Sequence, residues 1–89
     1  MTPIAPEPFT ERLIEYIAAE VATADDPIDA DTDLLLTGLV DSLGVILIVN
    51  WMEDELSISI DPADVVLENF QFVHQMVAYG QRREAVAAT

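Results

Sequence analysis

One serine in this sequence is placed where its hydroxyl could do chemistry. Ser42 follows Asp41 and precedes Leu43 in the apolar run GLVDSLGVILIVNWMEDEL. A helix is predicted to begin at Asp41–Ser42, where free backbone N–H groups and the helix dipole favour a phosphate. Ser42 could therefore carry a phosphodiester, or one of the two residues could simply cap the helix. Position alone favours the cap.

The sequence does not support Ser42 as a hydrolase nucleophile. LVDSLGV lacks the G-x-S-x-G turn, and the one histidine, His74, lies in the last predicted helix. An activated serine also needs an oriented base and an oxyanion hole, for which a small helical domain offers no evident cleft. We therefore expect a protein that is not an enzyme, with His74 as a surface or partly buried helix residue.

The acidic loop before Ser42 has part of the spacing of a calcium site. Asp29, Asp31 and Asp33 are spaced like the early ligands of a calcium loop. The sixth position, however, holds Leu34 where glycine is needed, and the twelfth holds Val40 where a bidentate glutamate is needed. Helix capping and solvation explain these acids better, so we expect no metal site.

Charge and composition limit the partners. The 89-residue chain has 17 acidic residues against three arginines, and its net charge is −14. Nucleic acid binding needs clustered cations, and anionic membranes are disfavoured for the same reason. We expect a monomer whose partners are proteins with basic patches, unless the charge only maintains solubility. Because the chain has no cysteine, any thiol chemistry must come from a cofactor.

No segment is expected to enter a membrane. The longest apolar-rich run, Leu43–Met52, is interrupted by Asn50 and is about half of the roughly 20 residues needed to span a bilayer. The first residues, MTPIAPEPFTERL, lack a cationic region followed by an apolar stretch, which a secretory signal needs. We therefore expect a cytoplasmic protein.

The periodicity predicts one all-α domain of four helices, three main and a short third, with a long loop between the first two. Three prolines within residues 1–9 predict an irregular lead-in. Thr10 is a good N-cap for a first helix that ends near residues 23–26. The domain is predicted to cover 10–83, and 84–89 to form a flexible tail.

The second helix is predicted from Asp41–Ser42 to about Leu56, with a core face that repeats at helical spacing (Ile46, Val49, Met52 and Leu56). Ser57–Ile60 alternates like a strand but has no partner strand, so it is predicted to be a loop. Asp61-Pro62 then opens the short third helix. The residues expected to pack that helix are Val65, Val66 and Leu67.

The last helix is predicted over about Phe70–Arg82, with a buried stripe of Phe70, Val73, Val77 and Gly80. The long loop before Asp41 is rich in leucine, so we expect it to pack over the helices. Gly38 is expected to supply a turn with positive φ. A loop of this length in a small domain is usually functional. Trp51 is expected to pack against the loop or a helix.

The segment around Ser42 resembles the acyl and peptidyl carrier protein family. Its members have a glycine, two apolar residues and Asp-Ser-Leu, then an apolar helix that ends in acids and a short apolar-rich loop. Residues 38–43, GLVDSL, match this pattern one by one. The upstream leucine loop, DPADV and ENF also match, so the likeness covers about residues 10–82.

The resemblance implies that Ser42 accepts 4′-phosphopantetheine from coenzyme A, installed by a magnesium-dependent phosphopantetheinyl transferase. The thiol of the arm would hold an acyl or aminoacyl group as a thioester, which accounts for the missing cysteine. Other implied partners are an adenylate-forming acyl or amino-acid ligase and a downstream acyltransferase or condensing enzyme. The pathway could be fatty acid, polyketide, nonribosomal peptide or cell-wall synthesis.

The resemblance also implies that partner enzymes read the second helix and its flanking loops. The candidate partner-binding residues are Asp41, Leu43, Leu47, Glu53, Asp54 and Asp64. Fatty-acid carriers place acids soon after the serine on the outward face of this helix, whereas this chain has Gly44 and Leu47 there. We therefore expect docking that is partly apolar around Ser42, unless Leu47 packs beneath the loop leucines.

The neutral start of the second helix resembles stand-alone aminoacyl or D-alanyl carriers more than a general fatty-acid carrier. The alternative function is a helical adaptor that keeps the fold without the arm. Such an adaptor would not need the Ser42 hydroxyl, so its binding would survive Ser42→Ala.

Overall fold

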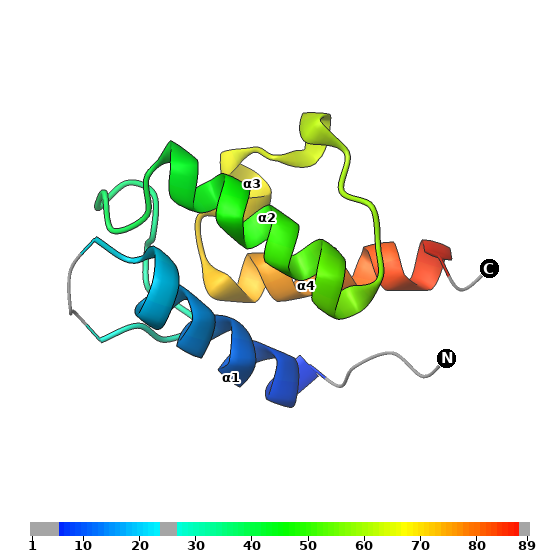
Figure 1. Cartoon of the computed structure of the whole chain (residues 1–89), viewed down its shortest axis with the longest axis horizontal. Coiled ribbons are helices and arrows are strands. Elements are labelled where there is room, and N and C mark those ends of the chain that lie inside the picture. The colour runs from blue at the N-terminus through cyan, green and yellow to red at the C-terminus, as the bar shows by residue number, and fades with distance from the viewer. Residues whose placement is uncertain (1–5, 24–26, 88–89) are drawn as a thin grey trace.

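The computed structural model describes residues 6–23 and 27–87 and is built from helices (Figure 1). The four α-helices are α1 Pro6–Tyr16, α2 Ser42–Leu56, α3 Leu67–Phe70 and α4 Val73–Ala87. A π-helical turn, Ile17–Val21, continues α1, and a 3₁₀ turn, Pro62–Asp64, precedes α3. No strand occurs among these described residues. The prediction of an all-α, four-helix fold is confirmed.

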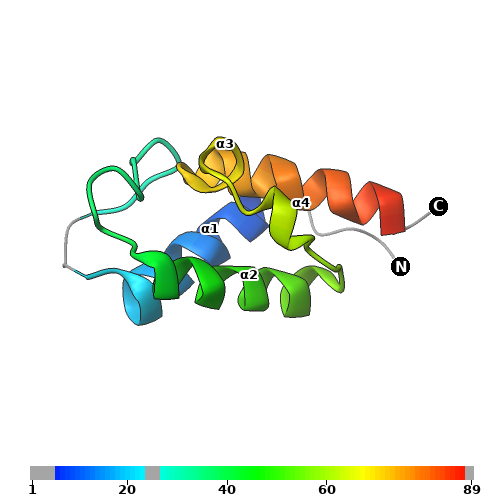
Figure 2. The same cartoon turned by 90° about the horizontal axis from the view of Figure 1, so that it is seen from above.

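The three long helices run along the length of the molecule (Figures 1 and 2). The loop between α1 and α2 lies at one end, and α2 begins at that same end. α4 ends at the opposite end of the molecule. Ser42 is therefore presented beside the long loop. None of the helices in 6–23 and 27–87 is long and apolar enough to cross a bilayer.

The ends of the first and last helices differ from the prediction. α1 begins at Pro6, so Thr10 lies within the helix and is not its N-cap. Prolines are tolerated here because the first N–H groups of a helix have no intrahelical partner, and Phe9 in this turn is only 2% exposed. α4 continues to Ala87. The remainder of the predicted lead-in and tail, 1–5 and 88–89, lies outside the described residues.

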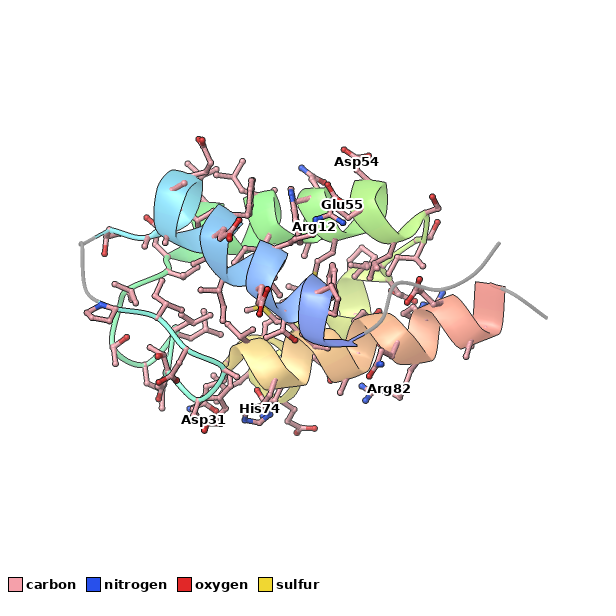
Figure 3. The ribbon with its side chains drawn as sticks, turned by 90° about the horizontal axis from the view of Figure 1, so that it is seen from below. Arg12, Asp31, Asp54, Glu55, His74 and Arg82 are labelled. Carbon is pink, nitrogen blue, oxygen red and sulfur yellow. The ribbon has the colours of Figure 1, made fainter. Side chains whose placement is uncertain are left out.

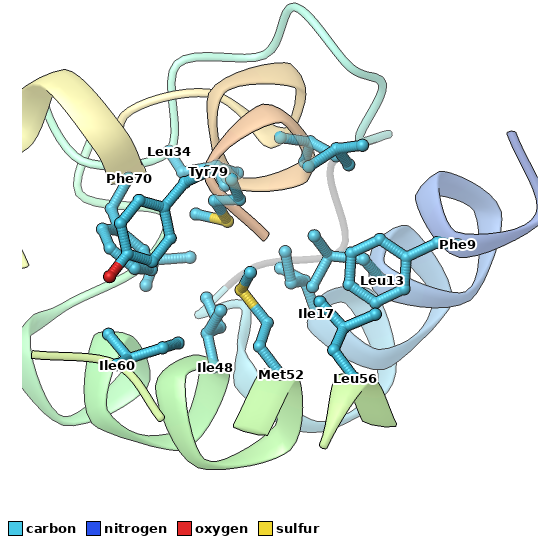
Figure 4. Close-up of a cluster of buried hydrophobic side chains, with 14 of the residues drawn as sticks. Phe9, Leu13, Ile17, Leu34, Ile48, Met52, Leu56, Ile60, Phe70 and Tyr79 are labelled. Atoms are coloured by element: carbon cyan, nitrogen blue, oxygen red, sulfur yellow. The ribbon is translucent and has the colours of Figure 1, made fainter. Parts of the chain in front are cut away.

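Side chains from the helices and the loop meet in one core (Figure 4). Its fully buried members are Phe9, Leu13, Ile17, Leu34, Val40, Ile48, Met52, Phe70, Val73 and Met76. Trp51 of α2 stacks on two rings of α1, with centroid distances of 5.6 Å to Phe9 and 5.0 Å to Tyr16. The expectation that Trp51 packs against a helix is confirmed.

The inward face of α2 was predicted wrongly in part. Its buried residues are Gly44, Ile48, Met52 and Leu56, whereas Ile46 is 56% exposed and Val49 is only partly buried. A Cβ on Gly44 would lie 2.7 Å from Val21 Cγ1. The close approach of this glycine turns the face that begins at Gly44, rather than the Ile46 face, toward the core.

The segment after α2 is a loop as predicted, with Ile58 and Ile60 buried in the core. The predicted third helix is divided into the 3₁₀ turn and α3. Asp61 caps the 3₁₀ turn, because its Oδ1 accepts a 2.9 Å hydrogen bond from Ala63 N. Val66 and Leu67 are each 44% exposed, so their predicted packing is wrong.

The last helix begins later than predicted. α4 begins at Val73, and Phe70 belongs to α3. The two residues between the helices let the chain change direction while Phe70 stays in the core. The predicted stripe of Phe70, Val73, Val77 and Gly80 is confirmed as buried.

Candidate functional site

Ser42 is the first residue of α2, and its side chain is exposed. The residue before it, Asp41, is the N-cap: its Oδ1 accepts a 2.9 Å hydrogen bond from Gly44 N. Val45 N donates to the Asp41 carbonyl oxygen at 3.0 Å. In the part of the chain that the structure describes, the Ser42 hydroxyl makes no hydrogen bond. Because Asp41 provides the cap, the hydroxyl of Ser42 is not needed for it.

The first turn of α2 suits a phosphate ester on Ser42. No acidic side chain lies within this turn, and the carboxylate of Asp41 is already engaged by Gly44. The first N–H groups of a helix have no intrahelical acceptor, and the helix dipole favours negative charge there. An exposed hydroxyl beside these donors could carry a phosphodiester, as the resemblance implies for Ser42.

The loop before Ser42 is held closed by backbone hydrogen bonds. Val40 N donates to Leu34 O at 2.9 Å, and Thr23 N donates to Leu39 O at 2.9 Å. Gly38 has a φ of 77°, as predicted for this turn. Leu34 and Leu39 are buried, so the expectation of a loop packed by its leucines is confirmed for both. These hydrogen bonds therefore fix the position of the loop residues that lead into α2.

Gly44 fixes the entry to α2 from the side of α1. Its ideal Cβ position lies 2.7 Å from Val21 Cγ1 and 2.9 Å from Val40 Cγ1. A larger residue there would push α2 away from the π-helical turn and from the loop. Because Gly44 has no side chain, the first turn of α2, which contains Ser42, can pack closely against Val21 and Val40.

The predicted partner-binding residues have different surroundings. Leu43 is 65% exposed and Leu47 is 37% exposed, and both belong to the outward part of α2. Asp54 is also exposed. Glu53, in contrast, accepts a 2.9 Å hydrogen bond from Ile60 N through Oε2. This acid anchors the loop that follows α2.

Glu55 of α2 and Asp64 of the 3₁₀ turn also interact with other side chains of the protein. Arg12 of α1 forms an ion pair with Glu55 of α2, and Figure 3 shows Asp54 beside this pair. Asp64 accepts a 2.7 Å hydrogen bond from the Tyr79 hydroxyl. These contacts join separate elements of the fold, which the sequence pattern did not indicate.

His74 and the aspartates of the long loop are not arranged as a catalytic or calcium site. His74 is exposed on α4, and its Nε2 lies 3.8 Å from Asp31 Oδ1 (Figure 3). Asp29 Oδ1 accepts a 2.8 Å hydrogen bond from Asp31 N within the loop. Among residues 6–23 and 27–87, no three His, Cys, Asp or Glu side chains are grouped so that they could hold a metal ion.

Two exposed apolar residues, one in the loop before α2 and one on α2, were not among the predicted site residues. Leu36 in the loop is 71% exposed, and Ile46 on α2 is 56% exposed. Leu36 adjoins two leucines that pack inward, and Ile46 was assigned to the core. No pattern in the sequence separates these two residues from their buried neighbours.

Comparison with known proteins identifies the family. The family described as "phosphopantetheine attachment site" matches residues 11–79 of the 89. A probable acyl carrier protein, PigG, from Serratia sp. (strain ATCC 39006) is 32% identical over 75 residues, which cover 83% of this chain and 86% of the relative. Such carriers bear a 4′-phosphopantetheine arm, interact with a modifying transferase and with biosynthetic enzymes, and are not themselves catalysts. The chain belongs to the phosphopantetheine-binding carrier proteins.

Proposed function

We propose that Ser42 is the residue to which the 4′-phosphopantetheine arm is attached. The observation that carries this proposal is the division of roles between Asp41 and Ser42 at the start of α2. Asp41 caps the helix through Gly44 N, and Ser42 is exposed at the first helical position. Ser42 also lies within the matched range, residues 11–79.

The attachment transfers one group from coenzyme A to the serine. The Ser42 oxygen forms a bond to the pantetheine-bearing phosphorus, and the bond from that phosphorus to the adenosine bisphosphate leaving group breaks. The hydroxyl proton leaves to a base of the magnesium-dependent transferase. The product is a phosphodiester at a helix N-terminus, where backbone N–H groups and the dipole stabilise its charge. The arm supplies a thiol that holds an acyl or aminoacyl group as a thioester.

The partners in this proposal act on the arm in sequence. An adenylate-forming acyl or amino-acid ligase loads the thiol, and an acyltransferase or condensing enzyme receives the cargo. The net charge of −14 favours partners with basic surfaces. We place these steps in the cytoplasm, where the folded carrier meets coenzyme A and its transferase.

Intact-mass measurement tests the attachment site directly. Wild type, Ser42→Ala and Ser59→Ala are each incubated with coenzyme A, magnesium and a broad-specificity phosphopantetheinyl transferase. We expect one phosphopantetheinyl addition on wild type and on Ser59→Ala, whose replaced serine is also exposed, and none on Ser42→Ala. An addition to Ser42→Ala, or no addition to wild type, would contradict the proposal.

A further inference from the structure

We propose that Gln71, which lies in the short connection between α3 and α4, is a positioning residue for the attachment of the arm. This inference rests on the proposed attachment at Ser42, and it adds a residue that belongs neither to α2 nor to the loop before it. Gln71 acts through two residues of that loop, Asp33 and Leu34. Its role is to hold the segment that leads into Ser42 in one position.

Gln71 is joined to the loop by both its side chain and its backbone. Its Nε2 donates a 2.9 Å hydrogen bond to Oδ2 of Asp33, and its carbonyl oxygen accepts a 2.8 Å hydrogen bond from Leu34 N. The side-chain bond joins residues that are 38 positions apart in the sequence. Because two adjacent loop residues bond to one residue, the loop cannot move away from the α3–α4 connection without breaking both bonds.

The carboxylate of Asp33 bonds to two different parts of the molecule. Its Oδ1 accepts a 3.0 Å hydrogen bond from Leu36 N within the loop, whereas its Oδ2 accepts from Gln71. The Thr37 hydroxyl donates to Asp33 O at 2.6 Å, which closes the same turn. The carboxylate therefore connects the turn of the loop with the α3–α4 connection, and both of its oxygens serve as acceptors.

The contact reaches Ser42 through the backbone of Leu34. The N–H of Leu34 is bonded to Gln71, and its carbonyl oxygen accepts a 2.9 Å hydrogen bond from Val40 N. Leu34 and Val40 are only 0% and 2% exposed, so both are also held by the core. Val40 is followed directly by Asp41, the N-cap of α2, and by Ser42. Two consecutive hydrogen bonds thus connect Gln71 to the entry of the helix that carries the serine.

A serine that is held in one position is a better substrate than one that moves with a loose loop. If only a fraction of the carrier molecules has Ser42 in the position that the transferase accepts, the apparent affinity falls by that fraction. Once the complex has formed, the serine is in place and the chemical step is unchanged. A positioning role therefore predicts a higher KM for the carrier at unchanged kcat.

Steady-state kinetics with a broad-specificity phosphopantetheinyl transferase, coenzyme A and magnesium test this role. Gln71→Glu has nearly the same shape as wild type but places a second carboxylate against Asp33, so the bond is lost and the two charges repel. We expect the KM for this variant to rise about tenfold at unchanged kcat. Tenfold corresponds to about 1.4 kcal/mol, which is within the cost of removing one partner from a charged hydrogen-bonded group.

A second substitution should reverse the effect. In Asp33→Asn/Gln71→Glu the donor and the acceptor are exchanged, because the amide at 33 donates to the carboxylate at 71 and keeps an oxygen for Leu36 N. We expect KM to return to within about twofold of wild type, since residues that share a hydrogen bond are energetically coupled. Glu11→Gln/Gln71→Glu restores the net charge equally, but at an exposed residue of α1, and its KM should remain high.

Tyr79→Phe separates positioning from a general loss of stability. It also removes a side-chain hydrogen bond to an aspartate, the 2.7 Å bond to Asp64, but at a contact that does not involve the loop before α2. We expect its free energy of unfolding to fall while KM stays at the wild-type value. Amide hydrogen exchange in the unmodified protein is an independent readout. Exchange at Leu34 N and Val40 N should be faster in Gln71→Glu and unchanged in Tyr79→Phe.

The outcomes separate this inference from the attachment itself. If wild type is modified at Ser42 but Gln71→Glu keeps the wild-type KM, or if Asp33→Asn does not reverse its effect, Gln71 is not a positioning residue and the attachment site stands. The same conclusion follows if Tyr79→Phe raises KM as much as Gln71→Glu does. If wild type is not modified at all, the attachment at Ser42 is wrong, and this inference fails with it.

Discussion

The phenolic hydroxyl of Tyr79 in α4 donates a 2.7 Å hydrogen bond to Oδ2 of Asp64, the last residue of the 3₁₀ turn. Tyr79 is only 4% exposed, and its ring lies 5.9 Å from that of Phe70. Burial, together with the Asp64 carboxylate, raises the pKa of Tyr79 to about 12. This bond holds the segment before α3 against α4.

The raised pKa of Tyr79 makes stability depend on alkaline pH. The tyrosine pKa in an unfolded chain is about 10, and in the folded protein it is about 12. The fold therefore favours the neutral phenol, and this stabilisation is fully present below about pH 10 and is lost as pH rises toward 12. Urea unfolding between pH 8 and about 11.5 should show a steeper fall in the free energy of unfolding for wild type than for Tyr79→Phe. Equal slopes would show that Tyr79 does not cause the effect.

Replacement of Gly44 by alanine should destabilise the protein. Alanine improves helix propensity by about 1 kcal/mol, but its Cβ would lie 2.7 Å from Val21 Cγ1, and overpacking costs about 1–3 kcal/mol. We expect a net loss of up to about 2 kcal/mol in the free energy of unfolding, measured with urea. Asn50→Ala, at an exposed position of the same helix, should be neutral or slightly stabilising. If both variants gained stability, the close contact would be refuted.

The N-cap of α2 is predicted to contribute measurably to stability. Asp41→Ala removes the acceptor for Gly44 N and should lower the free energy of unfolding by about 1 kcal/mol. Asp41→Ser keeps a capping oxygen, so it should lie close to wild type. Ser42→Ala should change stability far less than Asp41→Ala, because Ser42 does not cap the helix. A larger loss in Ser42→Ala would reverse this assignment.

The stacked rings of Phe9 in α1 and Trp51 in α2 should contribute strongly to the free energy of unfolding. Phe9→Ala removes a side chain that is 2% exposed, and such a truncation costs about 3–5 kcal/mol. It should also change the fluorescence of Trp51, whose ring stacks on Phe9. Glu11→Ala, at an exposed position of α1, is the control and should alter neither stability nor fluorescence. An unchanged melting temperature in Phe9→Ala would show that the Phe9 side chain does not pack in the core.

The features that depend on local sequence were predictable. The pair Asp41-Ser42 predicted the start of α2. The structure has its N-cap at Asp41 and an apolar run after Ser42, as expected. Gly38 was recognised because a tight turn needs positive φ. The SISI segment was excluded as a strand because no partner strand exists for it. For Asp41-Ser42 and Gly38 one short stretch of chain decides the conformation, and for SISI the absence of a second strand-like segment in the sequence was sufficient.

The features that depend on tertiary packing were not predictable. Almost every position of α2 before Glu53 is apolar, so periodicity could not distinguish the face that contains Ile46 from the one that contains Ile48. The choice depends on how closely Gly44 approaches Val21. Glu53 likewise looked like a surface acid, and only the folded loop shows that it accepts from Ile60 N.

The capping of α2 by Asp41 has a consequence for the working cycle of the carrier. Since the hydroxyl of Ser42 is outside the hydrogen bonds that hold the helix, the proposed esterification would break none of them. The added negative charge would lie at the N-terminus of the folded helix, where the free N–H groups and the dipole favour it. We therefore expect the form that carries the arm to unfold no more easily than the unmodified form.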